Sequence, residues 1–486
     1  MSSAPVSAHA RRWWTLAVLS IASLMLALDA TVINIALPRA QVDLGFSAGN
    51  RQWLITAYAL AFGSLLLLGG RLSDLWGRRI SLYVGLSGFA VASAAGGIAK
   101  SFTVLVSARA VQGVFGALLA PAALATLTTT FEGPRERARA FSFYGAVTGS
   151  GAAIGLLLGG ALTQWASWRW CLFINVVFAA MALVGVALFV HEGRSEHHTH
   201  LDVLGTVLGS AGLFFVVFGL SHAVTASWTD IFTWGSLVVG GGLLLAFTRW
   251  QQQSSHPLLP LRLLLDRTRG GSLAALLITN LGLFGISLLL VFYMQDSLGY
   301  SPLRTGVDFS PMVIALAFSA FIASARLLAR VGPRPLIPTG MLLSMMGVIL
   351  FTRLNPAANY FDSVLPGLVL TGLGLGLIVA PAVASATAGV RASDAGAASA
   401  LVNTTSQIGG SIGAALLNTI AVSATARFVI SLPPPVTTRQ VTLGVLHGYS
   451  VAFWWAAGLF GLGAVLSFGL LESGVPDLDA DQVLII

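Results

Sequence analysis

Residues 70–79 read GRLSDLWGRR, and this short charged segment lies between two apolar runs at 51–70 and 80–99. A degraded copy, ARLLARVGPR, occupies residues 325–334, an offset of 255 positions. The tripeptide Ala-Pro-Ala also recurs, at 120–122 and 380–382, an offset of 260. Because the two offsets nearly agree, the sequence predicts two similar halves with additional chain inserted between them.

The sequence around these repeats is too apolar for a water-soluble fold. Hydrophobic residues make up 56% of the 486 positions and charged residues 9%, whereas soluble domains carry roughly 25% charged residues. Many apolar stretches reach about twenty residues, which is enough for a helix to cross about 30 Å of hydrocarbon, and a membrane barrel would show short alternating segments instead. We therefore predict an all-α polytopic membrane protein with fourteen spans, at 13–37, 51–70, 80–99, 103–129, 139–163, 169–190, 202–222, 231–250, 271–294, 309–329, 336–352, 364–387, 396–421 and 447–471.

Parallel repeats of six spans are typical of secondary transporters, whose substrate site lies near the midplane where the halves meet. The predicted organisation is a cytoplasmic N-terminal tail at 1–12, an N-terminal six-helix bundle at 13–190, a linker with two extra helices at 191–250, a C-terminal six-helix bundle at 251–472, and a cytoplasmic C-terminal tail at 473–486.

The basic residues predict the orientation of the chain. Of the 26 Lys and Arg residues, seventeen fall on the side of the N-terminus, eight, Arg51 among them, fall in loops on the other side, and Arg109 lies within a span. The positive-inside rule then predicts a multi-pass protein of the plasma (inner) membrane with both termini in the cytoplasm. The net charge of +8 is too dispersed for a nucleic-acid partner. The lone Cys171 excludes an internal disulfide, and no separate cleavable signal is expected before the first span.

Two ionisable residues within predicted spans are candidates for proton coupling, because a charge there costs about 2.5–3.5 kcal/mol on insertion scales. Asp29 and Arg109 lie about eight and six residues from the outer ends of the first and fourth spans, roughly 12 and 9 Å deep at about 1.5 Å per residue. Apolar burial favours a protonated carboxyl group, whereas a nearby guanidinium favours the ionised form. Helix movement can therefore load and unload a proton. The alternative is a structural ion pair, or charges wetted by an outer vestibule.

Other polar residues within the spans are candidates for a substrate cavity. Arg109, Gln112 and two glycines share one helix face at i, i+3, i+4 and i+7, whereas Asp29 and Asn34 lie about 140° apart and face different directions. Interhelical hydrogen bonding and interfacial anchoring are the alternative roles. The predicted cavity residues are Asn34, Trp53, Tyr58, Gln112, Asn280, Tyr293, Asn403 and Gln407.

The fifth span is rich in glycine, and its residues Gly151, Gly155, Gly159 and Gly160 predict close helix packing or rocking. Catalytic and metal sites, in contrast, are not predicted. The single lysine lacks the glycine that a phosphate-binding loop requires. Residues 409–413 match a nucleophile-elbow pattern but lie inside an apolar span. The stretch His191–His200 is polar and short, and metal binding there is a minor alternative.

These motifs resemble the major facilitator superfamily, and specifically its fourteen-span drug:proton antiporter family. Residues 28–38 (LDATVINIALP), the two inserted spans, residues 109–113 (RAVQG), and Trp168-Arg169-Trp170 followed by Phe173-Ile174-Asn175 look like that group. Arg109 matches the arginine that the family's fourth-span motif implicates in proton transfer. The resemblance identifies a conformational latch loop made of Gly70, Arg71, Asp74, Gly77, Arg78 and Arg79.

The sequence departs from the family at Leu156, where the fifth-span motif has proline after Gly155. The resemblance predicts no enzyme but a proton-coupled antiporter that exports hydrophobic or cationic small molecules by rocking two bundles. The expected partners are a small-molecule substrate and the lipid bilayer, without nucleic acid, and the chain is expected to be a monomer with no cofactor other than the proton gradient. The alternatives are proton-coupled uptake of a nutrient or siderophore, and a non-transporting receptor on the same fold.

Overall fold

The computed structural model describes residues 8–131, 134–190, 202–225, 229–254, 257, 265–356, 358–390, 395–472 and 474. Within these ranges the regular structure is entirely helical. The N-terminal helices are α1 (Ala8–Leu44), α2 (Trp53–Trp76), α3 (Arg78–Gly97), α4 (Phe102–Thr130), α5 (Pro134–Trp165) and α6 (Trp170–Phe189). The inserted helices are α7 (Val203–Thr225) and α8 (Ile231–Gln253). The remaining elements are α10 (Arg267–Phe292), η1 (Tyr293–Ser297), α11 (Pro302–Ile322), η2 (Ala323–Leu327), α12 (Leu328–Val331), α13 (Pro333–Phe351), η3 (Tyr360–Val364), α14 (Leu365–Thr387), α15 (Ala395–Ile430) and α16 (Thr438–Leu470).

Thirteen helices in the described part of the chain are long and apolar enough to cross a bilayer. The predicted second span corresponds to α2, in which the apolar stretch Trp53–Leu66 is shorter than a full span. The all-helical membrane fold predicted from composition is confirmed, whereas the count of fourteen spans is not.

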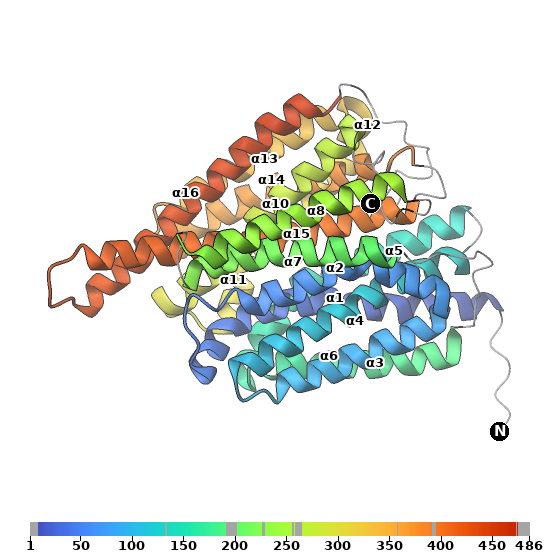
Figure 1. Ribbon diagram of the computed structural model, residues 1–486, viewed down its shortest axis with the longest axis horizontal. Helices are drawn as coiled ribbons and strands as arrows, with labels where there is room; N and C mark the ends of the chain where they lie inside the picture. Colours follow the sequence, from blue (N-terminus) through green and yellow to red (C-terminus); the bar gives the residue numbers. More distant parts are fainter. Residues whose placement is uncertain are drawn as a thin grey trace.

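Several helices extend beyond the predicted spans, because hydropathy marks only the part of a helix that faces hydrocarbon. The long helix α1 continues through Pro38 to Leu44, although the first span was predicted to end at residue 37. The helix α16 begins at Thr438, nine residues before the predicted span, where the Thr437 side chain and Gln440 form a capping box. The end of α15 and the start of α16 project from the bundle as a hairpin (Figure 1).

The helices form two groups, with α1–α6 on one side and α10–α16 on the other (Figure 1). The helix α7 packs against α2 from the first group and α15 from the second, and α8 packs on α7. Asp202 fastens this pair, because its carboxylate accepts hydrogen bonds from Trp250 Nε1 and Gln251 Nε2, both at 2.7 Å. The inserted helices therefore bridge the two halves along one side.

The membrane-spanning helices have two ends, and contacts between the halves occur at one of them. We call the end that carries the start of α1 and the end of α16 the terminal end, and the end that carries the α1–α2 and α15–α16 connections the far end (Figure 1). In the described residues, every hydrogen bond between α1–α6 and α10–α16 lies in the far-end part of the helices. The halves are therefore joined at the far end.

The glycines of α5 allow its backbone to approach two different helices. A Cβ atom at Gly151 would meet Ala27 at 2.6 Å, and one at Gly159 would meet the Val32 carbonyl oxygen at 2.9 Å, so this stripe, with Gly155 between them against Thr31, packs on α1. A Cβ atom at Gly160 would instead meet Leu303 Cα of α11 at 2.7 Å. The sequence pattern predicted close packing here, and the structure places it both within and between the halves.

Candidate functional site

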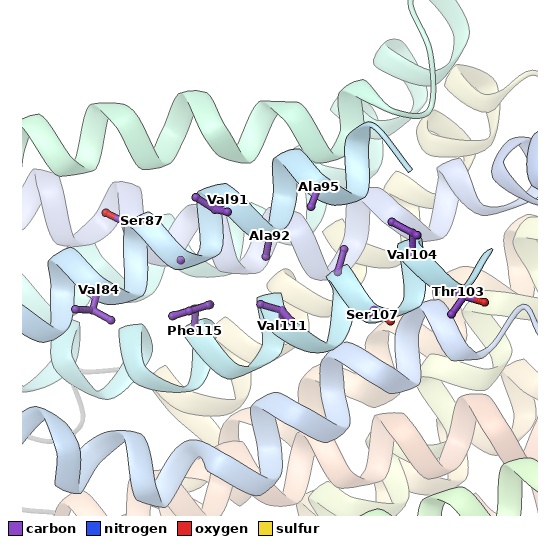
Figure 2. A pocket seen from close by; sticks show the side chains of 12 residues that line it. Val84, Ser87, Val91, Ala92, Ala95, Thr103, Val104, Ser107, Val111 and Phe115 are labelled. Carbon is purple, nitrogen blue, oxygen red and sulfur yellow. The ribbon is translucent and has the colours of Figure 1, made fainter. Parts of the chain in front are cut away.

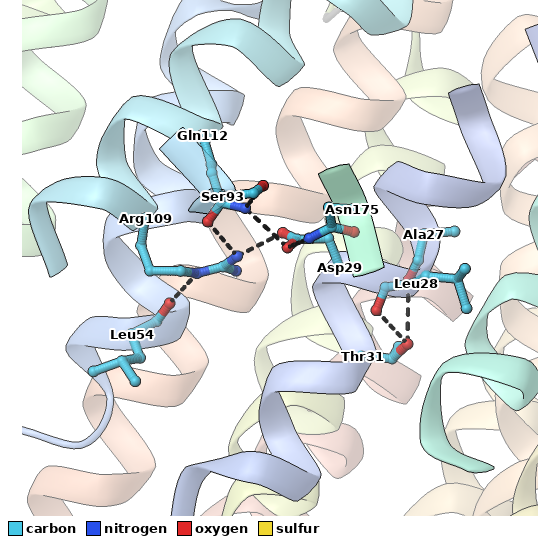
Figure 3. Close-up of polar contacts among 9 residues, drawn as sticks. All are labelled: Ala27, Leu28, Asp29, Thr31, Leu54, Ser93, Arg109, Gln112 and Asn175. Atoms are coloured by element: carbon cyan, nitrogen blue, oxygen red, sulfur yellow. Dashed lines mark hydrogen bonds and ion pairs between the residues drawn. The ribbon is translucent and has the colours of Figure 1, made fainter. Parts of the chain in front are cut away.

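Asp29 lies inside the N-terminal helix group, where its side chain is 1% exposed. Its Oδ2 accepts a hydrogen bond from Arg109 NH1 at 2.6 Å. Its Oδ1 accepts from Gln112 Nε2 at 3.1 Å and from Asn175 Nδ2 at 2.6 Å (Figure 3). The carboxylate of α1 is therefore surrounded by three N–H donors from α4 and α6.

Arg109 contacts partners on its own helix and on two others. Its Nε donates to the Leu54 carbonyl at 3.0 Å, and its NH1 donates to Gln112 Oε1 at 3.0 Å (Figure 3). The guanidinium carbon lies 4.5 Å from the centroid of the Tyr58 ring, a distance typical of a cation–π contact. Because Gln112 also donates to Ser93 Oγ at 2.7 Å, the site draws on α1, α2, α3, α4 and α6.

This arrangement places a compensated charge pair in the buried interior of the N-terminal group. A buried charge is tolerated when it is paired and hydrogen-bonded, and loss of one partner typically costs about 3–5 kcal/mol because the other charge stays buried. The described geometry is that of an ion pair within one half of the molecule. Proton exchange at Asp29 therefore requires a state in which water reaches the carboxylate.

The predicted cavity residues do not form one cluster. Tyr58 and Gln112 belong to the ion-pair site. Asn34 on α1 is 8% exposed, and its Oδ1 has no hydrogen-bond partner. The other five lie outside the ion-pair site. Trp53 packs on Phe218 of α7, Gln407 lies against Gly63 of α2, and Tyr293 donates to the Asn355 carbonyl at the far end. Asn280 and Asn403 each donate to a carbonyl of their own helix, those of Leu276 and Ser399.

The strongest polar contact between the halves was not predicted from the sequence. Arg51, Gln52, Phe292 and Asn418 form what we call the far-end clamp. Asn418 Oδ1 accepts from Arg51 Nε at 2.6 Å, and its Nδ2 donates to Gln52 Oε1 at 2.7 Å and to the Ala48 carbonyl at 3.1 Å. The Arg51 guanidinium lies 4.1 Å from the Phe292 ring centroid. The clamp therefore ties α2 and its preceding turn to α10 and α15.

Arg51 was assigned to a loop outside the membrane, and the structure instead buries it to 4% exposure between the halves. Its position directly before α2 explains the error, because loop charges are usually solvated. The residue that was missed is Asn418, an amide within the predicted span 396–421, which the structure buries fully. A cation at a span end and an amide within a distant span become neighbours only when the halves are docked.

The predicted latch loop connects α2 and α3 at the terminal end. Arg78 NH1 donates to Thr129 Oγ1 of α4 at 2.7 Å, and Arg79 NH2 donates to the Ala187 carbonyl of α6 at 3.3 Å. Gly77 has φ +91°, and Gly332, at the equivalent place in the second repeat, has φ +73°; both values favour glycine. These contacts stay within the N-terminal group. A Cβ atom added at Gly70 would lie 3.7 Å from Pro121 Cβ of α4. Arg71 is partly exposed, and the Asp74 side chain is outside the described atoms.

A groove of about 720 Å³ lies on the outer face of α3 and α4, where side chains such as Val84, Val91, Val111 and Phe115 line it (Figure 2). None of the predicted cavity residues contributes to it. Because the lining is almost entirely apolar and belongs to helices that pack within the N-terminal group, this groove faces lipid.

The described residues contain no group of three His, Cys, Asp or Glu side chains that could hold a metal ion. The stretch His191–His200 lies outside the described residues.

Comparison with known proteins identifies the family. A model of the Major Facilitator Superfamily matches residues 19–414. The puromycin resistance protein pur8 of Streptomyces alboniger is 45% identical over 482 residues, covering 97% of this chain and 95% of pur8. The cephamycin export protein CmcT of Amycolatopsis lactamdurans is 37% identical over 410 residues, covering 83% of this chain and 84% of CmcT. A crystal structure of an auto-inhibited POT family peptide transporter superposes with a TM-score of 0.68 at 14% identity, covering 98% of this chain and 100% of the transporter.

The fold, with two helix groups and an inserted pair, agrees with this match, and the superfamily resemblance seen in the sequence is confirmed. This chain belongs to the major facilitator superfamily of membrane transporters.

Proposed function

We propose that this chain is a proton-coupled antiporter of the fourteen-span group, which exports hydrophobic or cationic small molecules, antibiotics among them, across the plasma membrane. The observation that carries the proposal is the 45% identity to a puromycin resistance protein along 97% of the chain. The name of the cephamycin export protein adds support for export as the direction.

The proposed mechanism is alternating access by rocking of the two helix groups around a substrate cavity between them. With both termini in the cytoplasm, as the basic residues indicate, the far end faces outward. The far-end clamp and the contact of Gly160 with Leu303 then close the outer side of the transporter. The latch loop at the terminal end acts on the cytoplasmic side.

The proposed coupling site is the Asp29–Arg109 pair. A carboxylate with a single fixed counter-charge, in a setting that excludes water, changes its proton affinity when its donors move away. Opening of the far end would admit water to the site and allow Asp29 to take up a proton. The proton gradient is the energy source in this proposal, with no cofactor or metal, and the chain acts as a monomer in the bilayer.

The test uses proteoliposomes with an imposed pH difference and a panel of antibiotics that includes puromycin and a cephamycin. We expect pH-gradient-driven transport of at least one compound, and its loss in Asp29→Asn. The asparagine keeps an oxygen for Arg109 to donate to, so the variant should remain folded in the membrane.

The double variant Asp29→Asn/Arg109→Gln is the matched control, because it removes both charges and leaves none unpaired. Transport by Asp29→Asn at the parental rate with the same pH dependence would show that the ion pair is structural. Accumulation of a nutrient in cells without drug resistance would favour uptake, and the absence of any substrate-dependent proton flux would favour a non-transporting receptor.

A further inference from the structure

One buried polar atom beside Asp29 has no partner. Asn175 is 0% exposed, and its Nδ2 donates to Asp29 Oδ1 at 2.6 Å. Its Oδ1 makes no hydrogen bond to any residue in the described part of the chain. An unsatisfied buried acceptor costs about 1–3 kcal/mol, so such an atom calls for an explanation. The amide orientation itself is fixed by chemistry, because the reverse orientation would set its oxygen against a carboxylate oxygen.

The three donors around Asp29 differ in whether they can reverse their role. Arg109 has only N–H donors and cannot accept a hydrogen bond. Gln112 is held in one orientation, because its Oε1 accepts from Arg109 at 3.0 Å while its Nε2 also donates to Ser93 at 2.7 Å. Asn175 has a single recorded hydrogen bond. Rotation of its amide by half a turn therefore breaks no other contact.

A protonated carboxyl group needs an acceptor, which an ionised one does not. We propose that Asn175 supplies it: in the ionised state Nδ2 donates to Asp29 Oδ1, and in the protonated state the amide turns and its free Oδ1 accepts the Asp29 O–H. The proton comes from water and is bound to Asp29 alone, so Asn175 exchanges its donor for its acceptor without itself gaining or losing a proton. This inference rests on the proposed function and names the residue that allows the coupling site to exist in two states.

The other titratable and charged groups near the carboxylate leave this role to Asn175. Arg109 and Tyr58 lie together on the α4 and α2 side, where the ring packs on the guanidinium. Cys171, one turn before Asn175 on α6, is paired with Thr163 Oγ1 at 3.3 Å and contacts the Gly159 carbonyl. None of these three has a recorded hydrogen bond in which it accepts from Asp29 in the described structure, and Asn175 is the partner with an unused acceptor.

Infrared difference spectroscopy of the full chain in liposomes, between alkaline and acidic pH, tests the proposal. A carboxyl C=O band that is lost in Asp29→Asn reports protonation of that residue. In Asn175→Leu we expect this band to shift to higher frequency, as is typical of a carboxyl group whose O–H has no acceptor. In Asn175→Thr, whose hydroxyl can both donate and accept, the band should stay near its original position.

Thr279→Val is the control, because Thr279 is a fully buried residue of α10 with an equally unpartnered side-chain oxygen. It should leave the band unchanged. If Asn175→Leu does not fold, Asn175→Val replaces it. A band that disappears in Asp29→Asn but keeps its frequency in Asn175→Leu, or in Asn175→Val where that replaces it, would overturn this inference alone. A spectrum in which Asp29→Asn removes no band would overturn it together with the proposed proton site.

Discussion

The far-end clamp can be tested through Asn418, which we expect to control how often the far end opens. In Asn418→Ala, Arg51 Nε loses its acceptor at 2.6 Å, and Gln52 and the Ala48 carbonyl lose donors at 2.7 and 3.1 Å. Asn418 is fully buried, whereas water can take its place once the far end is open. The substitution therefore weakens the closed state more than the open one.

The size of the effect follows from the three bonds. A hydrogen bond to a charged group contributes about 1.5–3 kcal/mol and a neutral one about 0.5–1.5 kcal/mol, and part of each is recovered by water in the open state. A net change of about 3 kcal/mol shifts the equilibrium between the two states by roughly a hundredfold.

The assay measures the labelling of a cysteine that the closed far end hides. Thr56 is fully buried on α2 and donates to the Ser411 carbonyl of α15 at 3.4 Å. In a Cys171→Ser background, Thr56→Cys should react slowly with a membrane-impermeant thiol reagent added at the far end, and roughly a hundredfold faster when Asn418→Ala is added. Asn403→Ala is the matched control on the same helix, because the Asn403 side chain is exposed and bonds only the Ser399 carbonyl. An unchanged labelling rate in folded Asn418→Ala would refute the reasoning.

Three further predictions follow from packing and from the terminal end. Gly159→Ala should lower the melting temperature in detergent, because its Cβ would lie 2.9 Å from the Val32 carbonyl, whereas Gly149→Ala, with open space around it, should not; equal melting temperatures would contradict the α1–α5 contact. Asp202→Ala removes the acceptor for Trp250 and Gln251 and should destabilise the α7–α8 pair by about 2–4 kcal/mol, measured as faster proteolysis between these helices than in the parental protein. Arg78→Ala combined with Asp74→Asn should trap the protein in one access state, because Arg78 loses Thr129; cysteine labelling that is unaltered at both ends would argue against a latch.

The fold was largely predictable because lipid imposes simple rules on sequence. Long apolar runs must become helices, since the bilayer offers no hydrogen-bond partner for an open backbone. The offset of 255 residues between the two charged loops also corresponds to a structural repeat, because Gly77 and Gly332 both adopt positive φ between consecutive helices. Helix ends were predicted less well, since capping residues such as Thr437 act outside the apolar stretch.

The candidate site was predictable only in part. Similar depths in two spans indicated that Asp29 and Arg109 could meet, and the structure brings them together. Helical spacing cannot reveal that Asn175, on a third helix, completes the site, because contact between spans depends on how the helices pack. The same limit explains the far-end clamp, whose two key residues, Arg51 and Asn418, are 367 positions apart.

The adjacent residues Gly159 and Gly160 point to different neighbours, one to α1 of its own half and the other to α11 of the opposite half. In the proposed rocking cycle, a bulky side chain at Gly159 would strain an interface that stays closed, whereas one at Gly160 would strain an interface that separates and re-forms. Substitutions at these two consecutive residues should therefore change the stability of the protein and its rate of transport separately. A mutational scan of this single helical turn would measure stability and transport rate in the same set of variants.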